Sequence, residues 1–367
     1  MELLDFMKSN DNWKDLLVDK PYFLSIKNLP PLYILSYQQF LSDLSIPMVQ
    51  QARGFIVDEN LNVVCYAMDK FFNYGEANAA EIDWRSAVVT EKVDGSLMKL
   101  APIGDNEWLL STNNSIDAFS APINDFISFG NLFVQIVGGR TAYEKMIAGL
   151  DRSRCYWFEM VSPLNRIVCK YEPSIYYLGC RDLTTFEEHF EKIEFPVEFG
   201  IKYPKTYPLN SISGCLAAAQ ELGENREGFV VRDAFGRRIK VKSPWYLSMH
   251  HMYANGNLTI SHIVEMWEQD VLDDYVAVYP EHYELYIEPV MNTINSMAVE
   301  LEDARKLIMT NAFSTEKEYA EFVNSNFSSF VRPYIFMLKK KNIKPIEYIK
   351  NMALRTLVQY IRNRMEN

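Results

Sequence analysis

The sequence predicts an α+β fold, in which antiparallel sheets flanked by helices are followed by an all-α C-terminal domain. Across residues 53–246, short runs of β-branched and aromatic residues alternate with turn residues, which is typical of strands. Across residues 258–367, apolar residues recur at spacings of three and four, which is typical of helices. A chain of 367 residues also favours two domains over one. We expect these domains at residues 1–254 and 255–367, with the turn cluster Asn255-Gly256-Asn257 as the linker.

Within these domains the elements are expected in a definite order. Residues 1–50 indicate short helices and loops with a break at Pro30-Pro31. Strands are predicted at residues 54–58, 62–66, 108–110, 155–158, 175–178 and 228–231. Helices are predicted between the strands at residues 124–148 and 211–222. In the C-terminal domain, Thr315 and Glu318 form an expected capping box, and Pro345 fits the first turn of a later helix. The apolar stripes after both signals are expected to pack in the core.

Charge is distributed unevenly along the chain. The net charge of −11 argues against indiscriminate binding to nucleic acids. Residues 260–304 contain eleven Asp or Glu and no Lys or Arg, whereas residues 331–367 contain nine Lys or Arg and two Asp or Glu. Each segment fits a solvated helix face, and the basic one also fits a surface that contacts phosphates. That basic segment includes Lys339-Lys340-Lys341, Arg355, Arg362 and Arg364.

Cysteine usage and hydropathy set the expected environment. The five cysteines are scattered without a C-x-x-C pair, which favours reduced thiols over disulfides or zinc ligands. The first residues lack the basic and apolar pattern of a signal peptide. No apolar run reaches the roughly 18 residues that a membrane span requires. We therefore expect a cytoplasmic protein that has no membrane partner.

Six short motifs, in order and well spaced, carry the predicted chemistry. They are Arg53-Gly54, Lys70-Phe71-Phe72, Lys92-Val93-Asp94-Gly95-Ser96, Phe158-Glu159, Glu227-Gly228-Phe229 and Lys240-Val241-Lys242. One K-x-D-G match would be weak evidence, because four residues recur by chance. The ordered set is strong evidence for capture of a nucleoside triphosphate and attack on its α-phosphate by a lysine.

Lys92 is the predicted nucleophile. A lysine amine attacks only when deprotonated, and the ordinary lysine pKa of about 10.4 makes that state rare at neutral pH. Burial and nearby cations lower a lysine pKa, and Lys240 and Lys242 supply such cations. Because side chains alternate along a strand, both lysines face one side and Ile239 and Val241 face the other. The two lysines are expected to neutralise the α-phosphate as charge develops, although their alternation alone would also fit an exposed strand face.

Two carboxylates and a glycine turn extend this predicted pocket. Glu159 ends an aromatic strand and Glu227 begins another, so each must be paired, solvated or functional. Two carboxylates aimed into one pocket suit ribose hydroxyls, or the waters of a Mg²⁺ that bridges phosphates. In Asp94-Gly95, the glycine permits a tight turn and a close approach of backbone to nucleotide. An ordinary D-G turn is the simpler alternative.

Cations and aromatic rings in the earlier motifs complete the site. Arg53 and Lys70 are expected to hold the β- and γ-phosphates and the departing pyrophosphate. Phe72 or Tyr37 would stack on the base, although aromatic residues more often pack in a core.

These residues resemble the covalent nucleotidyltransferase superfamily, and within it most closely the RNA ligases of T-even phages, first type. Besides the six motifs, the resemblance includes Asn73, Leu97, Pro163-x-Asn165-Arg166-Ile167-Val168 and Ser243-x-Trp245-Tyr246. It covers roughly residues 35–250 and is thinner in the helical part, where Asp273-Asp274 and Tyr279-Pro280 remain suggestive. The resemblance implies an adenylyltransferase domain that uses ATP and Mg²⁺, with Mn²⁺ as an alternative.

The resemblance further implies a three-step reaction and a set of roles. Lys92 would form lysyl-AMP, AMP would pass to an RNA 5′-phosphate, and a 3′-hydroxyl would displace it. Glu159 would contact the ribose, Glu227 would position the metal through water, and Asp273 would approach a metal from the C-terminal domain. Tyr37 and Tyr246 would contact the nucleotide. The implied partner is RNA, including nicked tRNA, alongside an end-healing kinase-phosphatase. A monomer is expected, in the host cytoplasm if the chain is phage-encoded.

One departure and two alternatives remain. Asn113 stands where the family usually has a basic residue, which places triphosphate binding there in doubt unless Lys99 or another cation compensates. A DNA ligase or GTP-using capping enzyme shares the lysine chemistry, but normally continues into an OB-fold with a late R-x-D-K-like motif that this sequence lacks. A non-catalytic RNA-binding repair factor would be expected to lose the nucleophile or a glutamate, and both are present.

Overall fold

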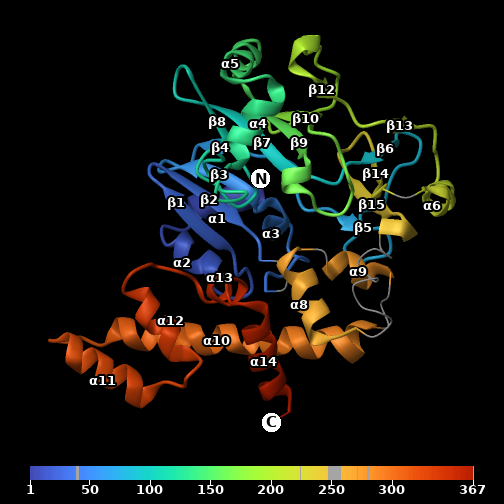
Figure 1. Ribbon diagram of the computed structural model, residues 1–367. Coiled ribbons are helices and arrows are strands. Elements are labelled where there is room, and N and C mark those ends of the chain that lie inside the picture. The colour runs from blue at the N-terminus through green and yellow to red at the C-terminus, as the bar shows by residue number, and fades with distance from the viewer. Residues whose placement is uncertain (39–40, 224, 247–257, 271, 279–281, 367) are drawn as a thin grey trace. The chain divides into compact units, whose positions relative to one another are not determined.

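The chain forms two compact units, Met1–Met249 and His250–Asn367, each of which is described by itself (Figure 1). The computed structural model describes all residues except 39–40, 224, 247–257, 271, 279–281 and 367. The expected linker at Asn255-Gly256-Asn257 lies outside the described residues. The predicted α+β class is confirmed, since the first unit is built on three sheets and the described elements of the second are helices.

The first sheet is antiparallel and carries the N-terminal helices. Its order is β1 (Ser25–Leu29), β2 (Leu32–Ser36), β3 (Arg53–Asp58) and β4 (Val63–Cys65). The helices are α1 (Glu2–Ser9), α2 (Trp13–Val18) and α3 (Pro47–Gln51). Their apolar faces pack with one face of the sheet in a core that includes Leu3, Leu17, Val49 and Phe55. The β1–β2 hairpin was not expected from the sequence, which indicated only a break at Pro30-Pro31.

The second sheet lies between the first sheet and two helices. Its order is β11 (Glu188–His189), β10 (Ser174–Asp182), β9 (Arg154–Val161), β7 (Ser96–Ile103) and β8 (Glu107–Ser111), and β12 (Ile201–Lys202) pairs in parallel with β10. Alternation along β7 places Met98 and Leu100 in the core shared with α4 (Phe129–Val137) and α5 (Arg140–Ala148). Leu97 and Ala101 face a separate core that includes residues of the first sheet.

The third sheet carries most of the motif residues. Its order is β13 (Thr206–Tyr207), β6 (Val88–Lys92), β14 (Gly228–Arg232), β15 (Arg238–Lys242) and β5 (Phe72–Asn73). Only the β15–β5 pair in this sheet is parallel. One face packs on α6 (Ile212–Glu221) and contains Ile239 and Val241, so the other face of β15 presents Lys240 and Lys242.

The described elements of the second unit are helices, as predicted for the C-terminal domain. They are α8 (Ile260–Glu268), α9 (Leu272–Val278), a π-helical turn (Tyr283–Ile287), α10 (Glu288–Thr310), α11 (Glu316–Asn326), α12 (Val331–Leu338), α13 (Pro345–Lys350) and α14 (Leu354–Met365). At the start of α11, the Thr315 hydroxyl accepts a hydrogen bond from the Glu318 N–H (3.1 Å). The Glu318 carboxylate accepts from Ser314 N–H instead of Thr315 N–H, so only half of the expected capping box forms.

Two helices predicted as continuous are each divided in two. The helix expected at 124–148 is α4 and α5, separated by Gly138 and Gly139, whose φ angles are +109° and +97°. A right-handed helix cannot continue through such backbone angles. Similarly, the stripe after Pro345 belongs to α13 and α14, with Ala353 as the residue that caps α14.

Candidate active site

Three neighbouring strands bring Lys92, Glu227 and Lys242 into one row. Lys92, the last residue of β6, is paired with Gly228 of β14, and Gly228 is paired with Lys242 of β15. The backbone of Gly228 has a φ of +144°, and a Cβ there would lie 2.1 Å from the Val241 carbonyl oxygen. Only glycine fits this position, and its absent side chain lets the strands close around the preceding glutamate.

The Glu227 carboxylate bridges the two lysines. One oxygen lies 2.8 Å from Lys92 Nζ and the other lies 2.8 Å from Lys242 Nζ. Glu227 is only 2% exposed, whereas the Lys92 side chain remains 21% exposed. A buried carboxylate requires such compensation, and loss of one partner of a buried pair typically costs about 3–5 kcal/mol. The arrangement holds the predicted nucleophile in place and keeps it accessible to a ligand.

Three lysines of the site contact aromatic rings. Lys240 Nζ lies 5.8 Å from the centre of the Phe71 ring, and Lys242 Nζ lies 4.5 Å from that of Tyr246. Lys70 is buried, with its Nζ 5.5 Å from the Tyr37 ring and 5.7 Å from the Phe72 ring. Both distances fit cation–π contact.

Asp94 anchors the turn after the nucleophile. One carboxylate oxygen accepts from the N–H groups of Val168 (2.8 Å) and Cys169 (2.7 Å), and the other accepts from the Tyr246 hydroxyl (2.9 Å). Burial, followed by the nearby Glu227 carboxylate, raises the pKa of Asp94. Asp94 and Tyr246 were both predicted to contact nucleotide. In this structure they contact each other, and Tyr246 is 1% exposed, so a direct nucleotide contact by either stays a prediction.

Gly95 makes a close backbone approach, but to a neighbouring strand. A Cβ on Gly95 would lie 2.5 Å from the carbonyl oxygen of Met160 in β9. The N–H of Gly95 also donates to Glu159 of the same strand (3.2 Å). The glycine therefore joins the nucleophile turn to the second sheet, and a close approach of its backbone to nucleotide stays a prediction.

Glu159 lies in an unusual electrostatic environment. The pKa of Glu159 is raised to about 7, mainly by burial and also by the carboxylates of Glu227 and Asp94, against the lowering effect of Lys92 and Arg53. Four motifs that are distant in the sequence thus meet around one carboxyl group. In the described part of the chain, Arg53 has one buried guanidinium nitrogen without a hydrogen-bond partner, and its guanidinium lies 5.4 Å from the Phe71 ring centre.

The structure places Asn113 and Lys99 beneath the Arg53-Gly54 motif. The Asn113 carbonyl accepts from the Ser36 hydroxyl (2.6 Å), and the Lys99 ammonium donates to the Gly54 carbonyl. Lys99 is fully buried, and burial lowers its pKa. Compensation by Lys99 for the missing cation at Asn113 stays a prediction.

Several residues around the site escaped the sequence interpretation. The Tyr171 hydroxyl accepts from Asp94 N–H (3.3 Å), and the Ser243 hydroxyl accepts from Tyr246 N–H (3.1 Å). Asn165, which like Ser243 was noted only within the family resemblance, donates to the Met160 carbonyl (3.0 Å). Polar residues in loops carry no periodic signal, so these contacts appear only once the strands are assembled.

The site as described is formed by residues of the first unit. Asp273 lies in α9, and its predicted approach to a metal stays a prediction. Within the described residues, no cluster of three or more His, Cys, Asp or Glu side chains is arranged to hold a metal ion.

Among the basic C-terminal residues, Lys339 pairs with Glu316 (2.5 Å) and Arg364 pairs with Glu300. None of the described helices combines the length and apolar character needed to cross a bilayer.

Comparison with known proteins agrees with this geometry. A family model described as RNA ligase, of the T4 type, matches residues 51–246, which include all six motifs. This chain belongs to the RNA ligase family. The predicted resemblance to the first type of T-even phage RNA ligase is therefore confirmed.

Individual relatives extend the comparison. A protein of Autographa californica nuclear polyhedrosis virus, provisionally named a bifunctional polynucleotide kinase/RNA ligase, is 31% identical over 77% of this chain and 42% of its own length. An RNA ligase of Rhodothermus phage RM378 is 25% identical over 62% of this chain and 66% of its own. The chain thus spans less than two thirds of either relative. Among solved structures, an archaeal ATP-dependent RNA ligase aligns over 88% of both chains, with 13% identity and a TM-score of 0.45.

Proposed function

We propose that this chain is an ATP-dependent RNA ligase that joins a 5′-phosphate RNA end to a 3′-hydroxyl end. The observation that carries the proposal is the row of Lys92, Glu227 and Lys242, which sets an accessible lysine amine beside a second cation. Membership of the RNA ligase family supports the same reaction. A lysine held in this way can attack phosphorus, and the neighbouring ammonium can offset charge that develops on the phosphate oxygens.

The proposed reaction has three balanced steps. The Lys92 amine attacks the α-phosphorus of ATP, a P–N bond forms, the bond to the bridging oxygen breaks, and pyrophosphate and a proton leave. An oxygen of the RNA 5′-phosphate then attacks the same phosphorus, which restores the lysine and gives an RNA capped by AMP. Finally, the 3′-hydroxyl attacks the activated 5′-phosphate, a phosphodiester forms, and AMP departs.

The chain's own residues take the following proposed roles. Lys240 and Lys242 contact the α-phosphate, Glu159 contacts the ribose, and Arg53 and Lys70 serve the pyrophosphate end. Tyr37 or Phe72, whose rings flank Lys70, would stack on the base. The roles of Lys242, Glu159 and Arg53 are supported by the ion pairs of Glu227 with Lys92 and Lys242 and by the charges of Lys92 and Arg53 that act on Glu159.

A divalent metal fits this site only in company with the nucleotide. Both Glu227 oxygens accept from lysines, so Mg²⁺ or Mn²⁺ would be held mainly by phosphate oxygens and water, with Glu227 acting through water. When bound, the ion would offset negative charge on the phosphates.

The physiological role that we propose is repair of broken RNA, including tRNA. The name of the viral relative couples ligase to polynucleotide kinase, which supports a division of labour between end healing and sealing. A separate kinase-phosphatase would then prepare the ends for this chain. We propose that the chain acts as a monomer in the cytoplasm, which would be that of the host if the chain is phage-encoded.

The first test is covalent labelling by ATP that is labelled at the α-phosphate. With Mg²⁺ present, a labelled band is expected near 42.7 kDa in a denaturing gel. The band should vanish in Lys92→Ala and persist in Lys145→Ala, whose side chain is exposed on α5. Treating the protein with pyrophosphate beforehand removes any nucleotide that was bound during purification. A labelled band in Lys92→Ala, or no labelled band in the wild type after pyrophosphate treatment, would contradict the proposal. Labelling by GTP but not by ATP would favour capping chemistry.

A further inference from the structure

A second pocket lies at the far end of β14 and β15 from the Lys92 row. It has a volume of about 640 Å³, within the range of about 300–1,000 Å³ that is typical of ligand sites. Arg238 begins β15 and Lys242 ends it, so at 3.4 Å per residue the two ends lie about 14 Å apart. Lys70 and Phe72 also line the pocket, which connects it with the proposed phosphate end of the nucleotide.

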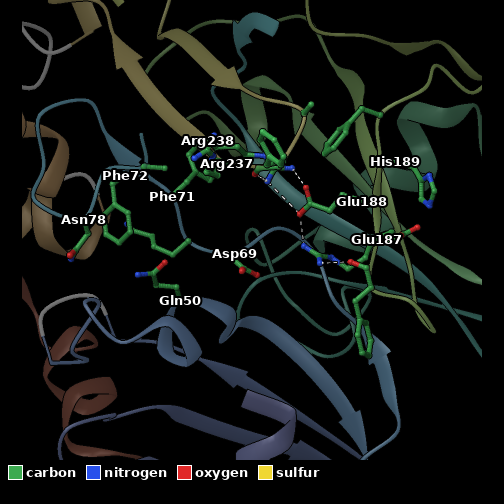
Figure 2. Close-up of a pocket in the computed structure, with 18 residues that line it drawn as sticks. Gln50, Asp69, Phe71, Phe72, Asn78, Glu187, Glu188, His189, Arg237 and Arg238 are labelled. Atoms are coloured by element: carbon green, nitrogen blue, oxygen red, sulfur yellow. Dashed lines mark hydrogen bonds and ion pairs between the residues drawn. The ribbon is translucent and has the colours of Figure 1, made fainter. Parts of the chain in front are cut away.

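Two arginines in the pocket are fixed by ion pairs with one glutamate. Figure 2 shows Gln50, Phe72 and Asn78 on one side, and Glu188 and Arg238 on the other. The Glu188 carboxylate forms ion pairs with both Arg238 and Arg181.

Other partners hold both guanidinium groups in place. Arg181 also donates to the Phe186 carbonyl (2.8 Å), and Arg238 donates to that of Gly236 (2.7 Å). These arginines therefore present rigid donors with much of their charge compensated. Such a surface suits neutral hydrogen-bonding groups better than a free phosphate.

Aromatic rings line the same pocket. They belong to Phe71, Phe72, Phe186, Phe190 and Phe235. The Arg238 guanidinium lies 5.1 Å from the Phe190 ring centre. Phe235 differs from the others because it is 73% exposed, and it stands on the turn between β14 and β15. Single-stranded nucleic acids bind to surfaces of this kind, since bases stack on aromatic rings and on guanidinium planes.

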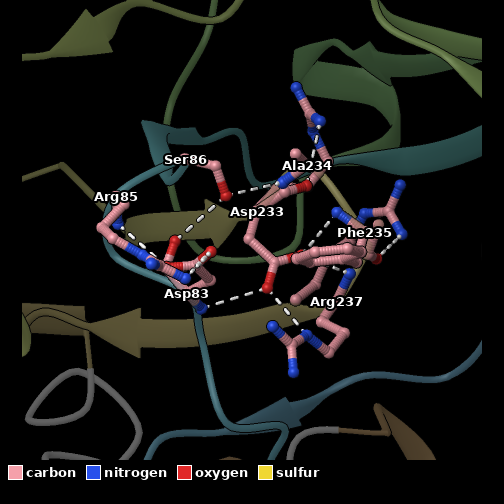
Figure 3. A network of polar contacts seen from close by, with 10 residues as sticks. Asp83, Arg85, Ser86, Asp233, Ala234, Phe235 and Arg237 are labelled. Atoms are coloured by element: carbon pink, nitrogen blue, oxygen red, sulfur yellow. Dashed lines mark hydrogen bonds and ion pairs between the residues drawn. The ribbon is translucent and has the colours of Figure 1, made fainter.

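Asp233 makes the turn that carries Phe235 rigid (Figure 3). Its carboxylate, which is fully buried, accepts from the N–H groups of Asp83 (3.1 Å) and Phe235 (3.0 Å). It also accepts from the Arg237 side chain (2.7 Å) and backbone (3.1 Å). An exposed ring on an anchored turn loses little freedom when a partner stacks on it. The turn is therefore built to present Phe235 outward.

We propose that this pocket binds one or two nucleobases of the single-stranded RNA next to the end being joined. A base stacks on Phe235, and base edges meet Gln50, Asn78 and the guanidinium groups fixed by Glu188. The inference rests on the proposed function, and it adds where the RNA strand lies relative to the nucleotide site. Because Lys70 also lines the pocket, RNA held there would lie next to the proposed phosphate end of the nucleotide.

The test measures RNA affinity apart from catalysis. Fluorescence anisotropy of a labelled single-stranded RNA with a 5′-hydroxyl, which cannot be ligated, reports binding to the full chain without ATP. Loss of one base–aromatic stack, worth about 1–3 kcal/mol, predicts about 5- to 150-fold weaker binding for Phe235→Ala. Phe235→Leu keeps an apolar side chain but lacks the ring, so it should lose as much RNA affinity as Phe235→Ala. Phe235→Trp keeps an aromatic ring and should bind RNA within about twofold of wild type.

The matched control is Phe126→Ala, which removes a ring that is 96% exposed and does not line the pocket. It should bind RNA as the wild type does. The inference is overturned if Phe235→Ala binds within about twofold of wild type, or if Phe126→Ala weakens binding equally. Photo-crosslinking of an RNA with 5-bromouridine gives a second readout, expected at residues 186–190 or 234–238, and crosslinks found only elsewhere would also overturn it.

Covalent labelling by ATP separates this inference from the proposed function. Phe235→Ala should form lysyl-AMP at the wild-type rate, because the ring lies at the opposite end of the strands from Lys92. Absence of labelling in the wild type would refute the ligase proposal. Normal labelling together with unchanged RNA affinity in Phe235→Ala would refute only the pocket.

Discussion

Ionisation of Glu159 links the stability of the first unit to pH. Burial raises the pKa of this carboxyl group from 4.5 to about 7, with Glu227 and Asp94 adding to the increase. Below pH 4.5 the group is protonated in both folded and unfolded chains. Between pH 4.5 and about 7 the unfolded chain releases the proton and the folded chain keeps it, so folding loses stability as pH rises. At about 1.4 kcal/mol per pH unit, the total loss is about 3 kcal/mol.

The Glu159→Gln variant removes this titration and keeps an oxygen that can accept from Gly95 N–H. Denaturant unfolding from about pH 4 to pH 9 should show the variant gaining stability relative to wild type up to about pH 7, with no further gain above it. Glu107→Gln, which replaces an exposed carboxylate on β8, is the control and should show no such gain. A stability difference between Glu159→Gln and wild type that does not change with pH would refute the reasoning.

The same titration should appear in catalysis. If the charged form of Glu159 contacts the ribose, the rate of lysyl-AMP formation in the wild type rises with pH through an inflection near 7. The Glu159→Gln variant should lack that inflection. If the inflection remains in the variant, a group other than Glu159 causes it.

Three further predictions follow from contacts of single residues. Gly95→Ala places a Cβ 2.5 Å from the Met160 carbonyl oxygen and should lower the unfolding free energy by about 1–3 kcal/mol in thermal melts, whereas Gly223→Ala, which meets no described atom within 4 Å, should not. Asp94→Asn replaces a buried acceptor of three hydrogen bonds and should cost about 1–3 kcal/mol in urea unfolding, together with slower lysyl-AMP formation. Burial would raise the pKa of Asp233, but its hydrogen bonds outweigh burial and lower it. Asp233→Asn should therefore be less stable than wild type at neutral pH, and the difference should disappear as pH falls through the acid range.

The sequence predicted side-chain directions correctly where they depend on a single strand. Alternation within residues 238–242 is enough to separate Ile239 and Val241 from the two lysines, because side chains of a strand point to opposite faces. The helix expected at 124–148 shows the limit of such reasoning. Its apolar spacing continues across Gly138-Gly139, and only the backbone angles reveal that the chain turns there.

Contacts between distant segments could not be read from the sequence. The close packing of Gly95 against Met160, which lies 65 positions later, was not among the predictions. Asp233 resembles an ordinary hairpin aspartate, and its bond to the Asp83 N–H depends on how two loops meet. No sequence pattern around Met160 or Asp83 marks these residues as contact partners. For the same reason, the pocket beside Phe235 was not expected.

A single strand register accounts for the spacing of the lysine and glutamate motifs. Lys92, Gly228 and Lys242 are directly paired across β6, β14 and β15, so a slip of one residue in β15 would turn both of its lysines toward α6. Glycine after Glu227 is needed because any Cβ at that position would meet the Val241 carbonyl oxygen. The glutamate and the glycine are thus one structural requirement. The carboxylate can reach both lysines only if the next residue leaves the neighbouring strand room to approach.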